Sequence, residues 1–326
     1  MRHKSSRCGF WHGGVHGDAA AKLFEYFGVK DDFELGIKLN DTFLAVYNGE
    51  MSYNHPNGDA ETDLYRHIKN VEIPPLCELT DGDIELAGKL NWPDRQYCDF
   101  SRFESIKNKA VHAGFPIIGG SHCGFFTYLW DTLGMEEYFV KMRADPEFVT
   151  EITERTVGYY LAANEKFLNL YKKDVAGCFT YIDLGTQIDL MISPEMFDKF
   201  ILPYLQKITE QAKKHGVYAV LHSCGSIIKA IPGIINSGFD ALNPIQPLAA
   251  GMDPENLAQK YKDKIVFIGG VDTQILLREG TADQIKDNVR YLKDLFGNNF
   301  IVAPSQSIMP DMPPANIAAM AEAAWE

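Results

Sequence analysis

The segment that most constrains the fold runs from residue 217 to residue 247. It opens with an apolar run, Val217 to Leu221, that is short enough to be a buried strand. A helical pattern begins after Gly225, with isoleucines at spacings of three and four, and ends at Gly238. A second apolar run, Phe239 to Leu242, follows. A strand, a helix and a second strand in this order predict one unit of a parallel sheet.

Two residues of this segment suggest chemistry. His222 and Cys224 stand two positions apart where the first strand ends. Side chains at positions i and i+2 of an extended segment project from the same side, so an imidazole and a thiol converge there. That pair suits zinc. The alternative interpretation is a packed histidine beside a buried cysteine.

Apolar runs with polar residues at their C-terminal ends recur along the whole chain, near positions 11, 46, 118, 182, 221, 242, 268 and 303. Most of these runs precede a helical pattern. The eight predicted strands match a (β/α)8 barrel, and we expect residues 1–326 to form a single barrel domain. Residues 54–100 are rich in Pro, Asp and Asn and predict a loop-rich excursion from it.

Helix signals support this order. Ser193 followed by Pro194 predicts a helix start, and the helical pattern continues to a stop at Gly216. Thr281 is expected to cap another helix that reaches about Phe296.

The C-terminal ends of the strands in such a barrel meet at one mouth, where the active site lies. The polar residues expected on that ring are His12, His122, Cys123, Asp183, His222, Cys224, Asn243, Gln246, Asp272 and Gln306. Several have a structural alternative. Asn243 and Gln246 are as well suited to holding loop backbone, and Asp272 to capping a helix. The aromatic residues Trp11, Phe125, Phe126 and Tyr128 form either a wall for an aryl group or part of the core.

Composition excludes some classes of partner. With 31 basic and 44 acidic residues the net charge is −13, which argues against binding to nucleic acid or to anionic membranes. Six cysteines without a CxxC pair favour a reducing, cytoplasmic compartment. No apolar leader follows the first residues and no apolar run reaches 18 residues, so neither a signal peptide nor a membrane span is expected.

A set of motifs carries a family resemblance. It comprises F-W near the N-terminus, D-L-G-T-Q, I-S-P-E-M-F, L-H-S-C-G-S, L-N-P-I-Q-P, G-G-V-D-T-Q and A-P-S-Q-S-I-M-P-D-M-P-P-A-N-I. Together they resemble the uroporphyrinogen decarboxylase superfamily, and within it the branch of cobalamin-dependent methyltransferases. The resemblance implies a single (β/α)8 barrel. It also implies zinc held by a His-x-Cys pair and a later Cys.

The chain departs from the decarboxylases in its N-terminal stretch. In that family an Arg-containing stretch binds a substrate with many carboxylates, whereas Gly9 to Asp18 holds neither Arg nor Lys. Burying carboxylates without cationic partners is costly. A decarboxylase is therefore kept as the alternative function, and a non-catalytic relative as a further one.

The chain also departs from the thiol methyltransferases. Gln306 stands where the resemblance implies the third zinc ligand, and an amide is a weak ligand for zinc. The candidates that replace it are Asp183, the first choice, and Cys123, His122 and His12. With fewer anionic ligands zinc is held more weakly, so it is expected to be lost easily on purification. It is also a stronger Lewis acid, which favours methyl removal from a methoxylated or similar small substrate.

The resulting hypothesis is a zinc-dependent methyltransferase that moves a methyl group between a small methoxylated compound or a thiol and a corrinoid. No cobalamin-binding Asp-x-His-x-x-Gly motif occurs, so the corrinoid is expected on a partner protein. The predicted catalytic residues are Asp183, His222 and Cys224, the last two as metal ligands. The predicted cofactor contacts are Asn243, Gln246, Asp272 and Gln306.

Overall fold

The computed structural model describes residues 8–46, 84–89, 92–120 and 123–326. Its centre is an eight-stranded parallel sheet with the order β1-β8-β7-β6-β5-β4-β3-β2. The strands are β1 (Gly9–Phe10), β2 (Leu44–Ala45), β3 (Ile117–Gly119), β4 (Gly177–Tyr181), β5 (Tyr218–His222), β6 (Ala241–Ile245), β7 (Val266–Val271) and β8 (Phe300–Pro304). Each of the eight predicted strands is present, and the predicted TIM-barrel fold class is confirmed.

The two outer strands of this sheet meet through Phe10 and Thr42. The backbone N–H of Thr42 donates to the carbonyl of Phe10 at 2.7 Å, and the N–H of Phe10 donates to Thr42 Oγ1 at 2.8 Å. These two hydrogen bonds connect β1 to the residues just before β2, so the sheet curls round on itself in the manner of a barrel.

The inside of the curled sheet is filled by one side chain from each strand or its immediate neighbour. These are Trp11, Phe43, Ile118, Phe179, Val220, Ala241, Ile268 and Ala303. Because side chains alternate along a strand, the other residues of each strand face the surrounding helices. The interior is therefore a packed layer, and the space available for a ligand lies beyond it, at the C-terminal ends of the strands.

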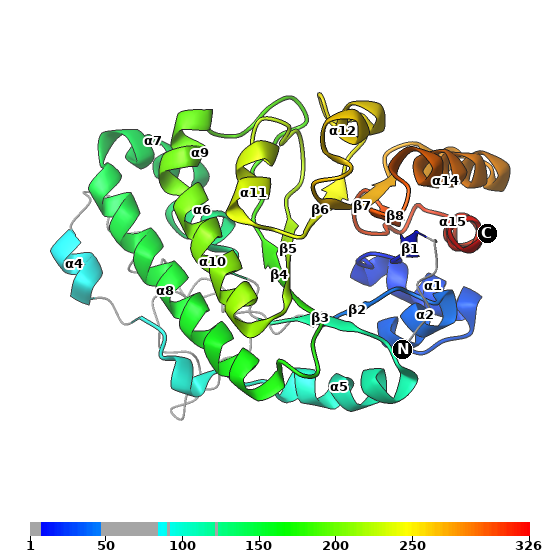
Figure 1. The fold of residues 1–326 in the computed structure, drawn as a ribbon, viewed down its shortest axis with the longest axis horizontal. Coiled ribbons are helices and arrows are strands. Elements are labelled where there is room, and N and C mark those ends of the chain that lie inside the picture. The colour runs from blue at the N-terminus through cyan, green and yellow to red at the C-terminus, as the bar shows by residue number, and fades with distance from the viewer. Residues whose placement is uncertain (1–7, 47–83, 90–91, 121–122) are drawn as a thin grey trace.

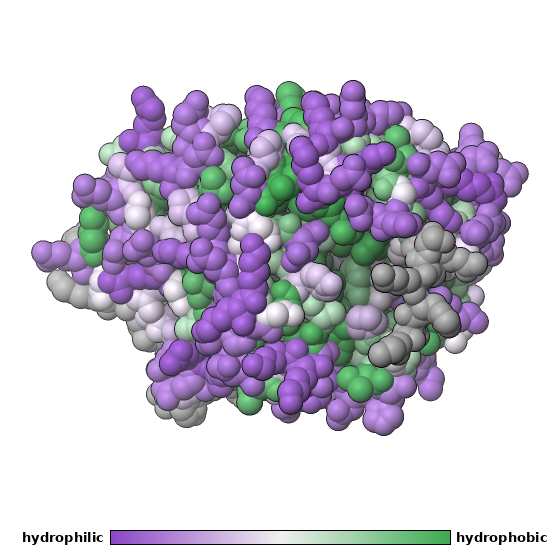
Figure 2. All heavy atoms as spheres, in the orientation of Figure 1, coloured by the Kyte–Doolittle hydropathy of each residue, from purple (hydrophilic) through white to green (hydrophobic). Residues whose placement is uncertain are grey.

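Helices lie around the outside of the sheet, with α8 and α10 along one side and α14 and α15 beside β8 and β1 (Figure 1). Figure 2 shows a mostly hydrophilic face with hydrophobic residues visible in its middle. The helices are α1 (Gly17–Phe27), α2 (Asp32–Leu39), α4 (Ile84–Lys89), η2 (Arg95–Tyr97), α5 (Ser101–Ala113), α6 (Phe125–Leu133), α7 (Met135–Ala144), α8 (Pro146–Tyr171), α9 (Pro194–Phe200), α10 (Leu202–His215), α11 (Ile231–Ser237), α12 (Pro254–Tyr261), α13 (Leu276–Glu279), α14 (Ala282–Phe296) and α15 (Pro314–Trp325).

The predicted helix caps are confirmed. Ser193 accepts the N–H of Met196 at the start of α9, with Pro194 in the first turn. Thr281 and Gln284 form a reciprocal capping box at the start of α14. Gly216 ends α10 in the left-handed conformation, with φ of 72°.

Two helix predictions were wrong in extent. The helix predicted after Gly225 begins only at Ile231, with Pro232 in its first turn. Residues 223–230 instead form a loop, in which Ser226 N–H donates to the carbonyl of Thr186. The helix predicted from residue 193 to 215 divides at Ile201 into α9 and α10, because Pro203 has no backbone N–H to continue the hydrogen bonds of α9. Cys224 lies in the loop of residues 223–230, two residues beyond the end of β5.

Most of the predicted excursion over residues 54–100 lies outside the described residues, as does His122. Its described part contains α4 and η2. In the described portion of the chain, no helix combines the length and apolarity that crossing a bilayer requires. The division of residues 1–326 into a single domain stays a prediction.

Candidate functional site

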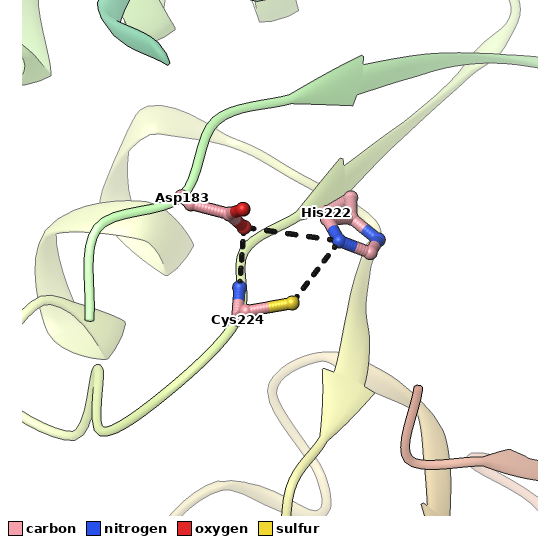
Figure 3. Close-up of side chains that lie close together, drawn as sticks. All are labelled: Asp183, His222 and Cys224. Carbon is pink, nitrogen blue, oxygen red and sulfur yellow. Dashed lines mark hydrogen bonds and ion pairs between the residues drawn. The ribbon is translucent and has the colours of Figure 1, made fainter. Parts of the chain in front are cut away.

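Asp183, His222 and Cys224 come together at the C-terminal ends of β4 and β5. His222 is the last residue of β5 and pairs in register with Tyr181, the last residue of β4. Ile182 N–H donates to the carbonyl of His222, which carries the pairing one residue further. Asp183 and Cys224 are therefore each the second residue beyond one of two neighbouring strand ends. Figure 3 shows their side chains converging with His222.

The distances between the donor atoms fit a metal ion. His222 Nε2 lies 3.4 Å from Cys224 Sγ and 3.8 Å from Asp183 Oδ1, and one ligand atom from each residue falls within 4.8 Å of the others. Ligands of a tetrahedral zinc are about 3.3–3.6 Å apart, given metal–ligand distances of roughly 2.0–2.3 Å. A sulfur, a nitrogen and an oxygen thus surround one point, which leaves a fourth position open.

Asp183 is fixed from three directions. One carboxylate oxygen accepts the backbone N–H of Cys224 at 2.9 Å, and the other accepts the hydroxyl of Tyr181 at 2.9 Å. Its own backbone N–H donates to Thr127 Oγ1 at 3.2 Å. Each carboxylate oxygen keeps a second lone pair, so these bonds orient the group and leave it able to bind a cation.

Without a cation, the thiol of Cys224 is held in its protonated form. Burial, and next the nearby carboxylate of Asp183, raise the pKa of Cys224 to about 12. Gln306 Nε2 donates a hydrogen bond to the sulfur at 3.3 Å, and this contact lowers the pKa by a smaller amount. A positive ion between the thiol and the carboxylate would lower the pKa of Cys224, because it stabilises the thiolate directly.

His222 is neutral at physiological pH. Burial lowers the pKa of its imidazole, and the carboxylate of Asp183 offsets only part of that shift. The ring stacks on Tyr181 with centroids 4.4 Å apart, and Nδ1 lies 2.8 Å from Asn243 Oδ1. A neutral imidazole is the form that binds metals.

A cavity of about 220 Å³ opens above His222. Among the described residues that line it, aromatic and amide side chains predominate and none is Arg or Lys. The side chains that face it include Trp11, Phe179, Tyr181, Asn243 and Gln306. The cavity therefore suits a small group with a neutral or aromatic body.

The remaining predicted cofactor contacts have structural partners. Gln246 Oε1 accepts the N–H of Gly225 at 2.9 Å and so holds the loop that carries Cys224. The Asp272 carboxylate accepts three backbone N–H groups, from Gln274, Ile275 and Leu276, at the start of α13. Gln246 and Asp272 thus have the backbone-holding and capping roles that are the structural alternatives for these residue types. Gln306 alone of these lies beside the Cys224 sulfur.

Of the four candidates for a third ligand, the structure brings Asp183 to the pair. His12 is buried elsewhere, with Nδ1 2.6 Å from Asp41 and Nε2 3.0 Å from Asp32. Cys123 lines a separate, very small cavity together with Cys178. His122 lies outside the described residues.

The aromatic wall was predicted incompletely. Phe125, Phe126 and Tyr128 are buried in the main core, whereas Trp11 does line the cavity. Sequence reasoning missed Phe179 and Tyr181. Phe179 and Tyr181 stand at alternate positions of β4, and Asp183 continues the same spacing just beyond its end. Side chains two positions apart on a strand share a face, and this period of two could have placed both rings on the side of Asp183.

Comparison with known proteins confirms the resemblance carried by the motifs. The family model described as uroporphyrinogen decarboxylase (URO-D) matches residues 103–326, which is more than half of the chain. The methylcobamide:CoM methyltransferase MtbA of Methanosarcina acetivorans is 25% identical over 134 residues, 41% of this chain and 38% of the relative. MtbA of Methanosarcina mazei matches with the same identity and coverage.

A uroporphyrinogen decarboxylase from Acidiphilium cryptum is 25% identical over 181 residues, which cover 55% of this chain and 47% of that protein. The matched region thus spans less than half the length of each of these relatives. A solved structure of a methyltransferase from Methanosarcina mazei has a TM-score of 0.64 at 17% identity and covers 98% of this chain and 92% of that one. This likeness establishes the fold.

Proposed function

The chain belongs to the uroporphyrinogen decarboxylase family, and on this premise we propose that it is a zinc-dependent methyltransferase. In this proposal it moves a methyl group between a small substrate and a corrinoid carried by a partner protein. The similarity to two methylcobamide:CoM methyltransferases supports methyl transfer as the reaction class.

The observation that carries the proposal is the convergence of Asp183, His222 and Cys224 on one point at the barrel mouth. The donor set of one nitrogen, one sulfur and one oxygen is typical of zinc and leaves room for a substrate atom. When bound, zinc would supply a Lewis acid that polarises a substrate oxygen or stabilises a thiolate. His222, Cys224 and Asp183 would hold it, and Tyr181 and Asn243 would orient those ligands.

Asp183 bears on which small substrate is used. As the third ligand it supplies the negative charge that Gln306 lacks, so net charge no longer separates this site from a two-thiolate one. The difference that remains is softness, because a carboxylate donates less electron density to the metal than a thiolate does. We therefore favour a methoxylated or similar oxygen-bound methyl group over a thiol. In that direction the methyl leaves as CH3⁺ for Co(I), and the substrate oxygen keeps the bonding electron pair and then takes up a proton.

A separate corrinoid protein is the proposed partner, because the chain contains no Asp-x-His-x-x-Gly motif. Residues 54–100, most of which lie outside the described residues, are our candidate for the segment that the partner meets. A cytoplasmic location, expected because the sequence has no CxxC pair, stays a prediction.

A decarboxylase is the second candidate, favoured by the match to the Acidiphilium cryptum enzyme. The residues that line the cavity do not fit the substrate of a decarboxylase of this family. Among the described residues that line the cavity above His222, none is Arg or Lys, and a substrate with many carboxylates requires such partners. A purely non-catalytic relative is disfavoured because three metal-ligand groups gather at the mouth.

The test is a pair of assays on zinc-loaded protein, with Cys224→Ala as the comparison. In both assays free cobalamin is supplied in large excess in place of the partner-bound corrinoid. One assay follows cob(I)alamin methylation by a panel of methoxylated aromatic compounds, and the other follows transfer from methylcobalamin to a small thiol. We expect wild type to be active in the first and Cys224→Ala to be inactive. Decarboxylation of a carboxylated tetrapyrrole, without methyl transfer in either assay, would establish the second candidate instead.

A further inference from the structure

Asn243 faces His222 across two neighbouring strands. The two residues are register partners in the parallel pairing of β5 with β6, and the carbonyl oxygen of the Asn243 side chain lies 2.8 Å from His222 Nδ1. Asn243 is only 3% exposed, so water does not compete for this contact. Among the described residues, His222 is the partner of the Asn243 amide oxygen.

The orientation of the Asn243 amide follows from its second contact. The side-chain nitrogen lies 3.4 Å from the backbone carbonyl of Ile268 on β7, and a carbonyl only accepts hydrogen bonds. The NH2 group must therefore face Ile268, which leaves the amide oxygen facing His222. An amide oxygen also only accepts, so the hydrogen between it and the imidazole sits on Nδ1.

The opposite tautomer would require a partner for a hydrogen on Nε2. Two acceptors are near it. Cys224 Sγ, 3.4 Å away, is a weak acceptor that already receives the N–H of Gln306, and Asp183 Oδ1, 3.8 Å away, is beyond hydrogen-bond distance. The hydrogen bond from Nδ1 to Asn243 Oδ1, at 2.8 Å, is stronger than one from Nε2 to Asp183 Oδ1 across 3.8 Å. The Nε2 lone pair then points toward Cys224 Sγ at 3.4 Å.

We propose that Asn243 is a positioning residue that keeps His222 in the Nδ1–H tautomer and aims the Nε2 lone pair at the centre of the Asp183–His222–Cys224 set. This replaces the direct cofactor contact expected from the sequence. Stacking on Tyr181 restricts the ring from its face, so Asn243 and Tyr181 together fix its orientation. The consequence for zinc rests on the proposed function, whereas the tautomer itself does not.

The first test is ¹⁵N NMR of the imidazole in metal-free protein, at a pH where His222 is neutral. Wild type is expected to show the Nδ1–H tautomer, and Asn243→Asp to retain it, because a carboxylate accepts the same hydrogen. Asn243→Leu is expected to shift the ring toward Nε2–H. Asn316→Leu is the matched control, since Asn316 is a buried amide that donates to the carbonyls of Leu277 and Gly280.

The second test is zinc affinity, measured by competition with a chromophoric chelator. We expect Asn243→Leu to lose roughly 10–100-fold, the usual effect of removing such an outer partner, and Asn243→Asp to bind at least as tightly as wild type. An Nε2–H tautomer in wild type or Asn243→Asp, or an unchanged tautomer in Asn243→Leu, would overturn the inference. If the tautomers are as expected but no zinc or methyl transfer is found, the proposed function fails and the positioning role stands.

Discussion

The carboxylate of Asp183 accepts the backbone N–H of Cys224 at 2.9 Å, although 41 positions separate the two residues in the sequence. The bond joins the loop after β4 to the loop after β5. It therefore fixes the position of the thiol relative to His222 without the help of a metal. Asp183 thus has two separable roles, as an anchor for this loop and as a charged donor.

Substitutions at Asp183 separate these roles. Asp183→Asn retains an oxygen that accepts the Cys224 N–H but removes the negative charge. We expect its zinc affinity to fall by more than about 100-fold, since losing a direct ligand exceeds the effect of losing an outer one. Its thermal stability is expected to stay close to that of wild type.

Asp183→Ala is the companion variant. It is expected to lose zinc binding and also about 1–3 kcal/mol of unfolding free energy, because the Cys224 N–H is left without its acceptor. Chelator competition and denaturant unfolding measure the two effects. Wild-type zinc affinity in Asp183→Asn would place the third ligand elsewhere.

A thiol at position 306 should strengthen the site. The side-chain nitrogen of Gln306, Nε2, lies 3.3 Å from Cys224 Sγ. A thiolate is a far better zinc ligand than an amide. We expect Gln306→Cys to raise zinc affinity on the order of tenfold or more. Gln274→Cys, which adds a thiol to an exposed position on the neighbouring loop, is the control and is expected to have no effect. Equal affinities in the two variants would contradict the assigned geometry.

The hydroxyl of Tyr181 is expected to matter through Asp183. Tyr181→Phe keeps the ring stacked on His222 but removes the hydrogen bond to the second carboxylate oxygen. We predict a loss of roughly tenfold in zinc affinity. Tyr218→Phe, at the exposed start of the same strand that ends in His222, is the matched control. If both variants bind zinc like wild type, Tyr181 does not support the ligand set.

His12 makes folding stability depend on pH in the alkaline range. Burial lowers the pKa of His12, but ion pairing with Asp41 and Asp32 outweighs this and raises the pKa to about 10. In the unfolded chain it is about 6.5, so its contribution is complete below about pH 6.5 and is lost as pH rises toward about 10. The expected loss is at most about 1.4 kcal/mol per pH unit.

Urea unfolding at several pH values tests this, with His12→Gln as the comparison that cancels the titration of other groups. The slope of unfolding free energy between about pH 6.5 and pH 10 should be shallower in the variant. Identical slopes would mean that His12 is not held in its charged form.

Local sequence signals were enough to predict the fold. Short apolar runs ending in polar residues located all eight strands, and Ser193 and Thr281 marked helix starts, because capping depends on residues three positions apart. The start of α11 was missed. The isoleucine spacing continues through residues 227–230, but contacts from Thr186 and Gln246 hold the preceding loop in another shape.

The site was predictable only in part, because some of its contacts come from other strands of the sheet. The spacing of His222 and Cys224 indicated a ligand pair, and the strand end before Asp183 made it the first choice as a partner. The bonds that orient these ligands come from Tyr181 and Asn243, on neighbouring strands. Which side chains face each other across strands depends on register, and the register of short, buried strands cannot be read from the local pattern of one sequence.

The proposed site holds one zinc ion by one sulfur, one imidazole nitrogen and one carboxylate oxygen of this chain. X-ray absorption spectroscopy at the zinc edge of the loaded protein tests it directly. We expect a single sulfur neighbour at about 2.3 Å together with nitrogen and oxygen neighbours at about 2.0–2.2 Å, and loss of the sulfur in Cys224→Ala. A zinc shell without sulfur, or with two sulfurs, would contradict it.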